Sequence, residues 1–341
     1  MTTILGRPIR RSALVATGVL TLIVVVVAAT PQLLGRRVGD AVGLLGEADP
    51  AFLWLAGLGF FCSLVGAAGS WRSAIGLCEG RLTLVDACTR YGVGSLVNTF
   101  VPARVGDAVR VALFSRALPH PSRVWSTGGA CVAVGAARAL VLAVLVVIGT
   151  FVGALPLWPV LVLGGSVALA VAVAVAVRGR RPGNRVSHAF DAFRGLGREP
   201  VAGLRIVGWV ALSTVGRVGA AAAVAAALGV SAPLSAALIV VPALDLAGLM
   251  PLTPGNLGVT STAVAMALQA RGVGVLDSLA SGIAFHAVET AVGISFGSAA
   301  TLLLVGLPSG GRRRLVVAVA GASACAALLA AFGATVLVDL V

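Results

Sequence analysis

The sequence contains no lysine, and all 25 of its basic residues are arginine. This absence excludes a Walker-A phosphate-binding loop, a Schiff-base mechanism and a lysine nucleophile. Charge of either sign is also scarce, since only 11% of the 341 residues are charged, whereas 59% are apolar and the mean hydropathy is +1.05. Such a composition excludes an ordinary soluble globular domain and is typical of a protein with several membrane spans.

Clustered metal ligands and catalytic carboxylates are missing as well. No Asp-x-Asp pair is present, and the cysteines show no metal-ligand spacing, so we interpret them as small buried apolar residues. We therefore expect no catalytic residue, no metal site and no cofactor, and the protein is not expected to be an enzyme. The five cysteines are Cys62, Cys78, Cys88, Cys131 and Cys325.

The net charge of +13 would suggest nucleic-acid binding in a soluble protein. Here the arginines concentrate in segments beside apolar runs, so the positive-inside rule explains them better and no nucleic-acid partner is expected. The richest segment holds six arginines within residues 178–198. We assign residues 178–202 to a basic cytoplasmic loop, which would also contact anionic lipid head groups.

The apolar runs predict an all-α polytopic membrane protein with about seven transmembrane helices, each reaching the ~20 residues that a bilayer requires. A signal peptide is the competing interpretation of the first run, but that run exceeds the usual ~7–15 apolar residues. The charge distribution places the N-terminus in the cytoplasm and the C-terminus outside, in a bacterial cytoplasmic membrane. Residues 1–341 would form one membrane domain. The expected spans are 12–29, 51–70, 125–153, 158–177, 203–228, 278–306 and a last run ending near 338.

The stretch from Tyr91 to Leu118 predicts an apolar helix that is broken at Val101-Pro102. Proline lacks an N–H and disfavours helix in the residue before it, so a second helix is expected after the break. Broken helices at membrane depth are tolerated only where protein or a water-filled cavity satisfies the freed backbone groups. We therefore predict a re-entrant hairpin here.

The second helix of this hairpin is expected to carry Arg104, Asp107 and Arg110 on one stripe, because residues three apart share a helix face. One hypothesis is a cradle for a head-group phosphate, in which the helix N-terminus and two guanidiniums face the anion. Asp107 would hold the guanidiniums, and Asn98 would add an amide. The alternative is an interfacial helix whose arginines extend to water.

A second apolar stretch is broken by Pro251, Pro254, Gly255 and Asn256, and it predicts a second hairpin. The first hairpin would have its ends in the cytoplasm and the second would have its ends outside, because of the arginine distribution. Each hairpin is followed by a long span with a charge in its middle. Two such halves with opposite orientation form an inverted-topology repeat, as in secondary transporters.

The spacing of the parts supports this repeat. Pro102 precedes Arg138 by 36 positions, and Pro254 precedes Glu289 by 35. We assign residues 51–177 to the first repeat and residues 203–338 to the second.

Four ionisable residues stand near the middle of apolar runs, namely Arg138, Arg217, Asp245 and Glu289. A charge at the bilayer centre costs on the order of 3 kcal/mol, so each needs a partner or water. Their charges sum to zero, which fits two structural ion pairs or a polar path along which those pairs open and close. His286 lies one helical turn before Glu289 and is either a satisfied buried histidine or part of a titrating pair.

The segment from Pro102 through Arg104, Gly106 and Asp107 to Arg110 resembles the P-x-x-x-G-[DE]-x-x-R signature of one membrane family. This family is the flippase-like membrane domain of lysylphosphatidylglycerol synthases and its stand-alone relatives. The second hairpin, Pro251-Leu-Thr-Pro254-Gly255-Asn256-Leu257-Gly258-Val259, is similar to that family's P-x-x-P-G-G-L-G-V element.

This resemblance covers roughly residues 10–310 and has departures in its second half. The family usually has a glycine where Asn256 stands, a glutamate where Ser261 stands and an arginine near His286. The resemblance implies movement of a lipid between leaflets. It implies no lipid aminoacylation, because the sequence ends at Val341 without a soluble transfer domain.

We therefore expect a flippase or scramblase-like transporter that moves a phospholipid, or a polyprenyl-phosphate-linked lipid, across the membrane, with membrane lipids as its partners. Without a nucleotide-binding motif, any drive would come from an ion gradient or the membrane potential. An integral membrane transferase with a lipid-linked donor and a non-transporting scaffold of an envelope-synthesis complex stay open as alternatives. The sequence also leaves open whether the protein is a homo-oligomer.

Overall fold

The computed structural model describes residues 3–4, 7–8, 44, 46, 48–101, 105–119, 123–162, 164–165, 200–248 and 258–305. Within them the chain is helical except for one short strand pair, β1 (Thr3–Ile4) and β2 (Arg7–Pro8), which pair antiparallel. The all-α prediction is otherwise confirmed for the described residues. The strand pair precedes the first apolar run of the sequence.

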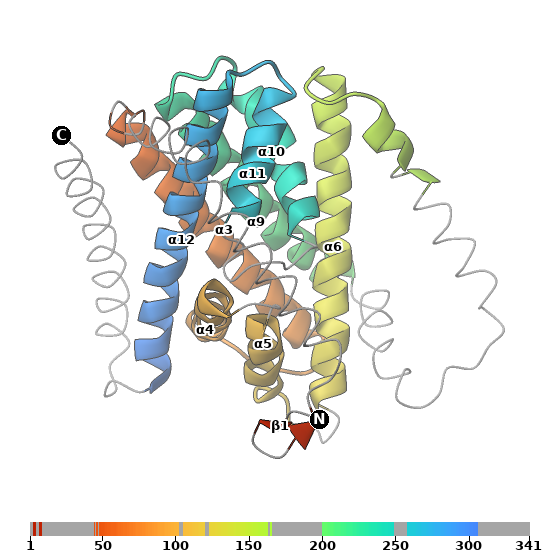
Figure 1. Cartoon of the computed structure of the whole chain (residues 1–341). Helices are drawn as coiled ribbons and strands as arrows, with labels where there is room; N and C mark the ends of the chain where they lie inside the picture. Colours follow the sequence, from red (N-terminus) through yellow and green to blue (C-terminus); the bar gives the residue numbers. More distant parts are fainter. Residues whose placement is uncertain are drawn as a thin grey trace.

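In the described part of the chain, α3–α6 and α9–α12 form two groups of four helices with the same order of lengths (Figure 1). In each group two short helices stand between two long ones. The first group is α3 (Pro50–Gly76), α4 (Leu84–Phe100), α5 (Val105–Ser115) and α6 (Arg123–Phe151). The second group is α9 (Pro200–Ala227), α10 (Pro233–Ala247), α11 (Val259–Gln269) and α12 (Val275–Val305).

The four long helices α3, α6, α9 and α12 are long and apolar enough to cross a membrane. They begin within three residues of four predicted spans, those at 51–70, 125–153, 203–228 and 278–306. The predicted span 12–29 and the last predicted run, ending near 338, lie outside the described residues, as does most of 158–177. The protein is therefore a helical membrane protein with several spans.

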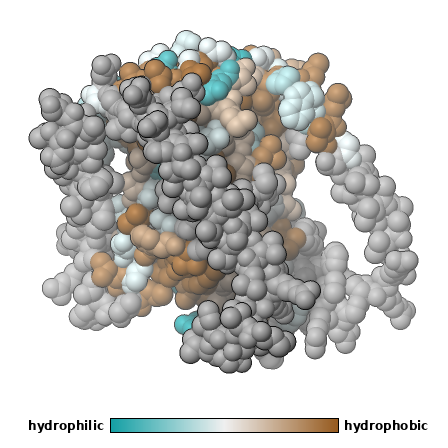
Figure 2. Space-filling view, viewed as in Figure 1, coloured by the Kyte–Doolittle hydropathy of each residue, from teal (hydrophilic) through white to brown (hydrophobic). Residues whose placement is uncertain are grey.

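Large apolar side chains are exposed on the outer faces of the long helices. Trp54 and Leu58 on α3 are 57% and 59% exposed, and Val132 and Leu140 on α6 are 54% and 56% exposed. Figure 2 shows a largely hydrophobic surface over the described part of the face in view, with hydrophilic residues mainly near its upper edge. Such an apolar exterior would be costly in water and fits contact with hydrocarbon.

The cysteines correct one sequence-based expectation, because none of the four described ones is fully buried. Cys62, Cys78 and Cys88 are partly buried, and Cys131 is exposed on α6. On a membrane-spanning helix the exposed side also faces an apolar medium. A small apolar residue therefore suits that position without being buried in protein.

Helix α4 ends at Phe100, directly before the predicted break. Its C-cap residue Val101 is extended, with φ −112° and ψ 127°, as expected for a residue that precedes proline. At the other end a capping box fixes the start of α4, since Thr83 and Asp86 satisfy each other's backbone N–H groups. The predicted helix end before Pro102 is therefore confirmed, while Pro102 itself and the residues of the second break, 251–256, lie outside the described residues.

The two groups of helices pack in matching ways. If each helix is replaced by its counterpart in the other group (α3 by α9, α4 by α10, α5 by α11, α6 by α12), every packed pair again becomes a packed pair. The α3–α9 pair maps onto itself, and each other pair has a packed counterpart. The two hairpins, α4–α5 and α10–α11, lie toward opposite ends of the bundle in Figure 1. This is the pattern expected of an internal repeat related by a two-fold axis. The matching pairs are α3·α4 with α9·α10, α4·α5 with α10·α11, α5·α6 with α11·α12, α4·α12 with α10·α6, α3·α6 with α9·α12, and α6·α9 with α12·α3.

The equivalent helices α3 and α9 pack antiparallel along a seam of small residues. A Cβ atom built on Gly59 would lie 2.7 Å from the carbonyl oxygen of Gly216, and one built on Gly216 would lie 2.6 Å from that of Gly59. One turn after Gly59 on α3, the hydroxyl of Ser63 lies 3.0 Å from the hydroxyl of Ser213 on α9. Without a hydrophobic driving force inside lipid, such close backbone packing is a main source of helix association.

Replacing Gly66 with alanine should therefore destabilise the protein. A Cβ at Gly66 would lie 2.7 Å from the backbone nitrogen of Ser213 and 2.8 Å from the carbonyl oxygen of Trp209, so the two helices must separate. Overpacking of this kind costs about 1–3 kcal/mol, which exceeds the roughly 0.5–1 kcal/mol that alanine gains over glycine within a helix. The measurement is thermal unfolding of the purified protein in detergent.

The matched control is Gly76→Ala, on the same helix, where an added Cβ meets no atom within 4 Å. We expect this variant to melt at or slightly above the wild-type temperature. Equal melting temperatures for the two variants would contradict the proposed seam.

Candidate functional site

The four charged residues predicted at mid-span come together from four different helices. Arg138 lies on α6, Arg217 on α9, Asp245 on α10 and Glu289 on α12. Arg138, Arg217 and Glu289 stand in the middle of long apolar helices. Asp245 stands near the C-terminal end of α10, next to the connection between the two helices of its hairpin. The site therefore joins both groups of helices.

These residues form one continuous series of ion pairs. The Oδ1 atom of Asp245 accepts hydrogen bonds from Arg138 Nη2 and from Arg217 Nη1, the latter at 2.7 Å. The other terminal nitrogen of Arg217, Nη2, lies 3.7 Å from Glu289 Oε1. We call this series, in the order Arg138, Asp245, Arg217 and Glu289, the charge chain. The structure thus links the four residues together, whereas the sequence suggested two separate pairs or a path.

The middle of the charge chain is buried and its ends are accessible. The side chains of Asp245 and Arg217 are 13% and 16% exposed, whereas those of Arg138 and Glu289 are 55% and 34% exposed. Arg217 also has a buried Nε without a hydrogen-bond partner in the described structure. Buried charges of this kind depend strongly on their partners, because an unpaired charge cannot recover its hydration.

His286 stands beside the charge chain and is hydrogen-bonded within its own helix. Its Nε2 atom lies 3.5 Å from the hydroxyl of Thr290, and its buried Nδ1 has no hydrogen-bond partner in the described structure. Glu289 stands one helical turn further along α12. Of the two sequence hypotheses for His286, neither is decided by these contacts, and a titrating pair with Glu289 stays a prediction.

A second polar group joins the two helices of the first hairpin. The guanidinium of Arg110 donates from Nη1 to Asp107 Oδ1 at 2.6 Å and from Nη2 to Ser95 Oγ at 2.7 Å. Its Cζ atom lies 4.1 Å from the centre of the Tyr91 ring, in a cation–π contact. Asn98 Nδ2 donates to the same Asp107 oxygen at 3.1 Å. We call these five residues the hairpin cluster.

The guanidinium of Arg110 is bound by other residues of the hairpin cluster. The Arg110 side chain is only 14% exposed and is paired with Asp107, whose own side chain is 44% exposed. Two glycines allow this close approach, since a Cβ on Gly94 would lie 2.8 Å from the carbonyl oxygen of Gly106. Arg110 thus cross-links α4 and α5. Its contact with a head-group phosphate stays a prediction, and Arg104 lies outside the described residues.

Sequence reasoning missed Tyr91 and Ser95 as partners of Arg110. They stand four residues apart on α4, with Asn98 three residues further, which places all three on one face of that helix. This spacing was available in the sequence as a signal. Without the angle between α4 and α5, however, nothing indicated that this face meets Arg110.

Helix α6 brings the hairpin cluster near the charge chain. It packs against α5, which carries Asp107 and Arg110, and also against α9 and α10, which carry Arg217 and Asp245. Helix α6 therefore contacts helices of both the hairpin cluster and the charge chain.

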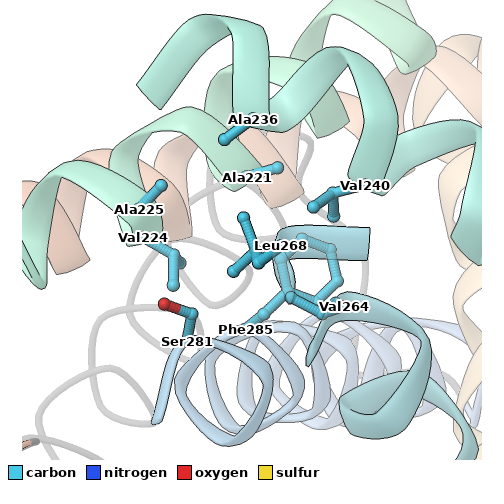
Figure 3. A pocket seen from close by; sticks show the side chains of 9 residues that line it. All are labelled: Ala221, Val224, Ala225, Ala236, Val240, Val264, Leu268, Ser281 and Phe285. Atoms are coloured by element: carbon cyan, nitrogen blue, oxygen red, sulfur yellow. The ribbon is translucent and has the colours of Figure 1, made fainter. Parts of the chain in front are cut away.

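A small pocket lies apart from these charges, among α9, α10, α11 and α12 (Figure 3). Its lining is apolar, for example Val240, Leu268 and Phe285, except for the hydroxyl of Ser281. That hydroxyl is buried and has no hydrogen-bond partner in the described structure. A buried water needs about two to four polar partners, and this pocket offers one, so it does not suit a polar head group.

The described residues contain no group of three or more His, Cys, Asp and Glu side chains placed to hold a metal ion. A family model described as the lysylphosphatidylglycerol synthase TM region matches residues 12–297. The matched range includes both hairpins and the whole charge chain, and it confirms the family suspected from the motif at Pro102–Arg110. No curated protein matches the chain.

Proposed function

Because the chain belongs to the lysylphosphatidylglycerol synthase TM-region family, we propose that it moves a lipid with a phosphate-containing head group between the leaflets of the cytoplasmic membrane. The family ties this membrane protein to lipid handling. Our proposal goes beyond lipid handling, because it assigns flippase or scramblase activity on a phospholipid or on a polyprenyl-phosphate-linked lipid.

The observation that carries the proposal is the charge chain with its two accessible ends. Ionisable residues at mid-span are costly, and where they occur they usually mark a substrate or ion pathway. Ion pairs that served only to join helices would not need members that stay open to the outside of the bundle. Here the end residues Arg138 and Glu289 remain accessible instead, at 55% and 34% exposure.

Within the charge chain, Arg138 is the residue best placed to bind a phosphate. Its planar guanidinium carries five N–H donors, and only its Nη2 is engaged by Asp245 in the described structure. The remaining N–H groups of the guanidinium would donate charge-assisted hydrogen bonds to the phosphate. Asp245 would keep its bond to Arg217 throughout, so no buried charge loses its partner while the head group is bound.

The surface of α6 offers a route for the acyl chains. Val132, Leu140 and Val144 flank Arg138 on this helix and are 54%, 56% and 51% exposed. The head group would therefore follow the polar side of the bundle while its chains stay among apolar side chains and lipid. Hairpins that enter the membrane from opposite faces would give access to the charge chain from each leaflet in turn.

The test is leaflet exchange in reconstituted vesicles. A trace of phospholipid with a fluorescent acyl chain is quenched from outside by dithionite, and exchange exposes the inner-leaflet fraction over time. Wild-type protein should accelerate this exchange above that of protein-free vesicles. Arg138→Gln should slow it about tenfold or more, because a hydrogen bond to a charged group is worth about 1.5–3 kcal/mol.

Arg123→Gln is the matched control, since Arg123 is an exposed arginine at the first residue of the same helix. It should leave the exchange rate near that of the wild type. The proposal fails if folded wild-type protein exchanges lipid no faster than empty vesicles. The role of Arg138 fails if both arginine variants behave alike.

A further inference from the structure

We infer that the charge chain selects a zwitterionic phospholipid, whose head group carries both a phosphate and a protonated amine. This inference rests on the proposed function and specifies the substrate class of the same site. It follows from the order of charges along the chain, because the two accessible ends have opposite sign. Arg138 stands at one end and Glu289 at the other, with Asp245 and Arg217 between them.

The cationic end offers one accessible arginine. Arg138 is 55% exposed, whereas Arg217 is 16% exposed and already donates to Asp245. In the hairpin cluster Arg110 is likewise only 14% exposed and bonded to Asp107. Of these three arginines, therefore, Arg138 is the one that can contact a phosphate without first losing a buried partner.

The anionic end has an unsatisfied carboxylate. Glu289 lies 3.7 Å from Arg217 Nη2, which is too long for a hydrogen bond, and no other donor to Glu289 is found among the described residues. A carboxylate accepts several hydrogen bonds, and a primary ammonium has three N–H donors to give. An amine of a bound head group would satisfy Glu289 better than Arg217 does in this structure.

The charge balance favours the same class of lipid. The four residues of the charge chain sum to zero, so a head group with no net charge leaves the site neutral. An anionic head group would add a negative charge beside Glu289 and Asp245, in a region where an uncompensated charge is costly.

The experiment compares two acyl-labelled lipids with identical chains, phosphatidylethanolamine and phosphatidylglycerol, in vesicles of one fixed composition. Wild-type protein should exchange the ethanolamine lipid about tenfold faster than the glycerol lipid, since one set of charge-assisted hydrogen bonds differs between them. Glu289→Gln should bring the ratio of the two rates toward one. Asp277→Asn, an exposed carboxylate in the first turn of the same helix, should keep the wild-type ratio.

A binding measurement keeps the inference testable if Glu289→Gln does not fold. Wild-type protein incubated with equal amounts of the two lipids should retain mainly phosphatidylethanolamine, as read by native mass spectrometry. Equal or greater exchange and retention of phosphatidylglycerol would overturn the inference, and so would a Glu289→Gln variant that keeps the wild-type ratio. Exchange of neither lipid by folded wild-type protein would instead contradict phospholipid exchange, the part of the proposed function on which this inference rests.

Discussion

Replacing Asp245 with asparagine should destabilise the protein more than any other single substitution in the charge chain. One oxygen of Asp245 accepts hydrogen bonds from two guanidiniums, and the side chain is only 13% exposed. The neutral amide would leave Arg217 buried with Glu289 at 3.7 Å as its remaining ion pair. Removing one partner of a buried ion pair typically costs about 3–5 kcal/mol.

A thermal unfolding series in detergent would check this expectation. Glu289→Gln is the comparison, because a half-exposed pair at 3.7 Å is expected to contribute only about 0–1 kcal/mol. The double variant Arg217→Gln and Asp245→Asn should recover part of the loss, since it removes the stranded charge together with its partner. An Asp245→Asn protein that melts at the wild-type temperature would contradict the assigned role of this carboxylate.

Much of the helical architecture could be predicted because hydrocarbon imposes simple rules on sequence. Apolar runs of sufficient length marked α3, α6, α9 and α12, and proline marked the end of α4 at Phe100. A charge in the middle of an apolar run requires a partner, so four such charges with zero sum predicted that ion pairs would form. These inferences need no knowledge of how the helices pack.

The partners themselves could not be predicted, because they depend on tertiary packing. Arg138 and Asp245 are 107 residues apart in sequence, and only the contact between α6 and α10 brings them together. The sequence likewise could not show that one carboxylate serves two arginines. The same holds for Arg110, for which the sequence left open a phosphate ligand or an arginine extending to water, and which the structure packs against Tyr91 and Ser95.

The two groups of helices likewise have features that the sequence could predict and features that depend on tertiary packing. The similar spacing from Pro102 to Arg138 and from Pro254 to Glu289 was visible in the sequence. The antiparallel seam between α3 and α9 was not, because small residues are frequent throughout this glycine-rich chain. Contacts such as that between Ser63 and Ser213 identify which small residues form the seam.

The inverted arrangement of the two hairpins, which we propose from the matching order of the helices, predicts opposite accessibility for their two outer ends. Arg81 precedes α4, and Ser231 precedes α10; both are exposed. The positive-inside rule assigns the arginine-rich end at Arg81 to the cytoplasm. We therefore expect that a reagent added on one side of the membrane labels one of these two positions and does not label the other.

The most direct measurement uses single cysteines at these two positions, in a protein whose five native cysteines are replaced by alanine, and a membrane-impermeant maleimide added to intact spheroplasts. Ser231→Cys should be labelled in intact cells, and Arg81→Cys should be labelled only after lysis, with full labelling of both in detergent as the control for reactivity. Labelling of both cysteines from the same side of the membrane would contradict the inverted arrangement.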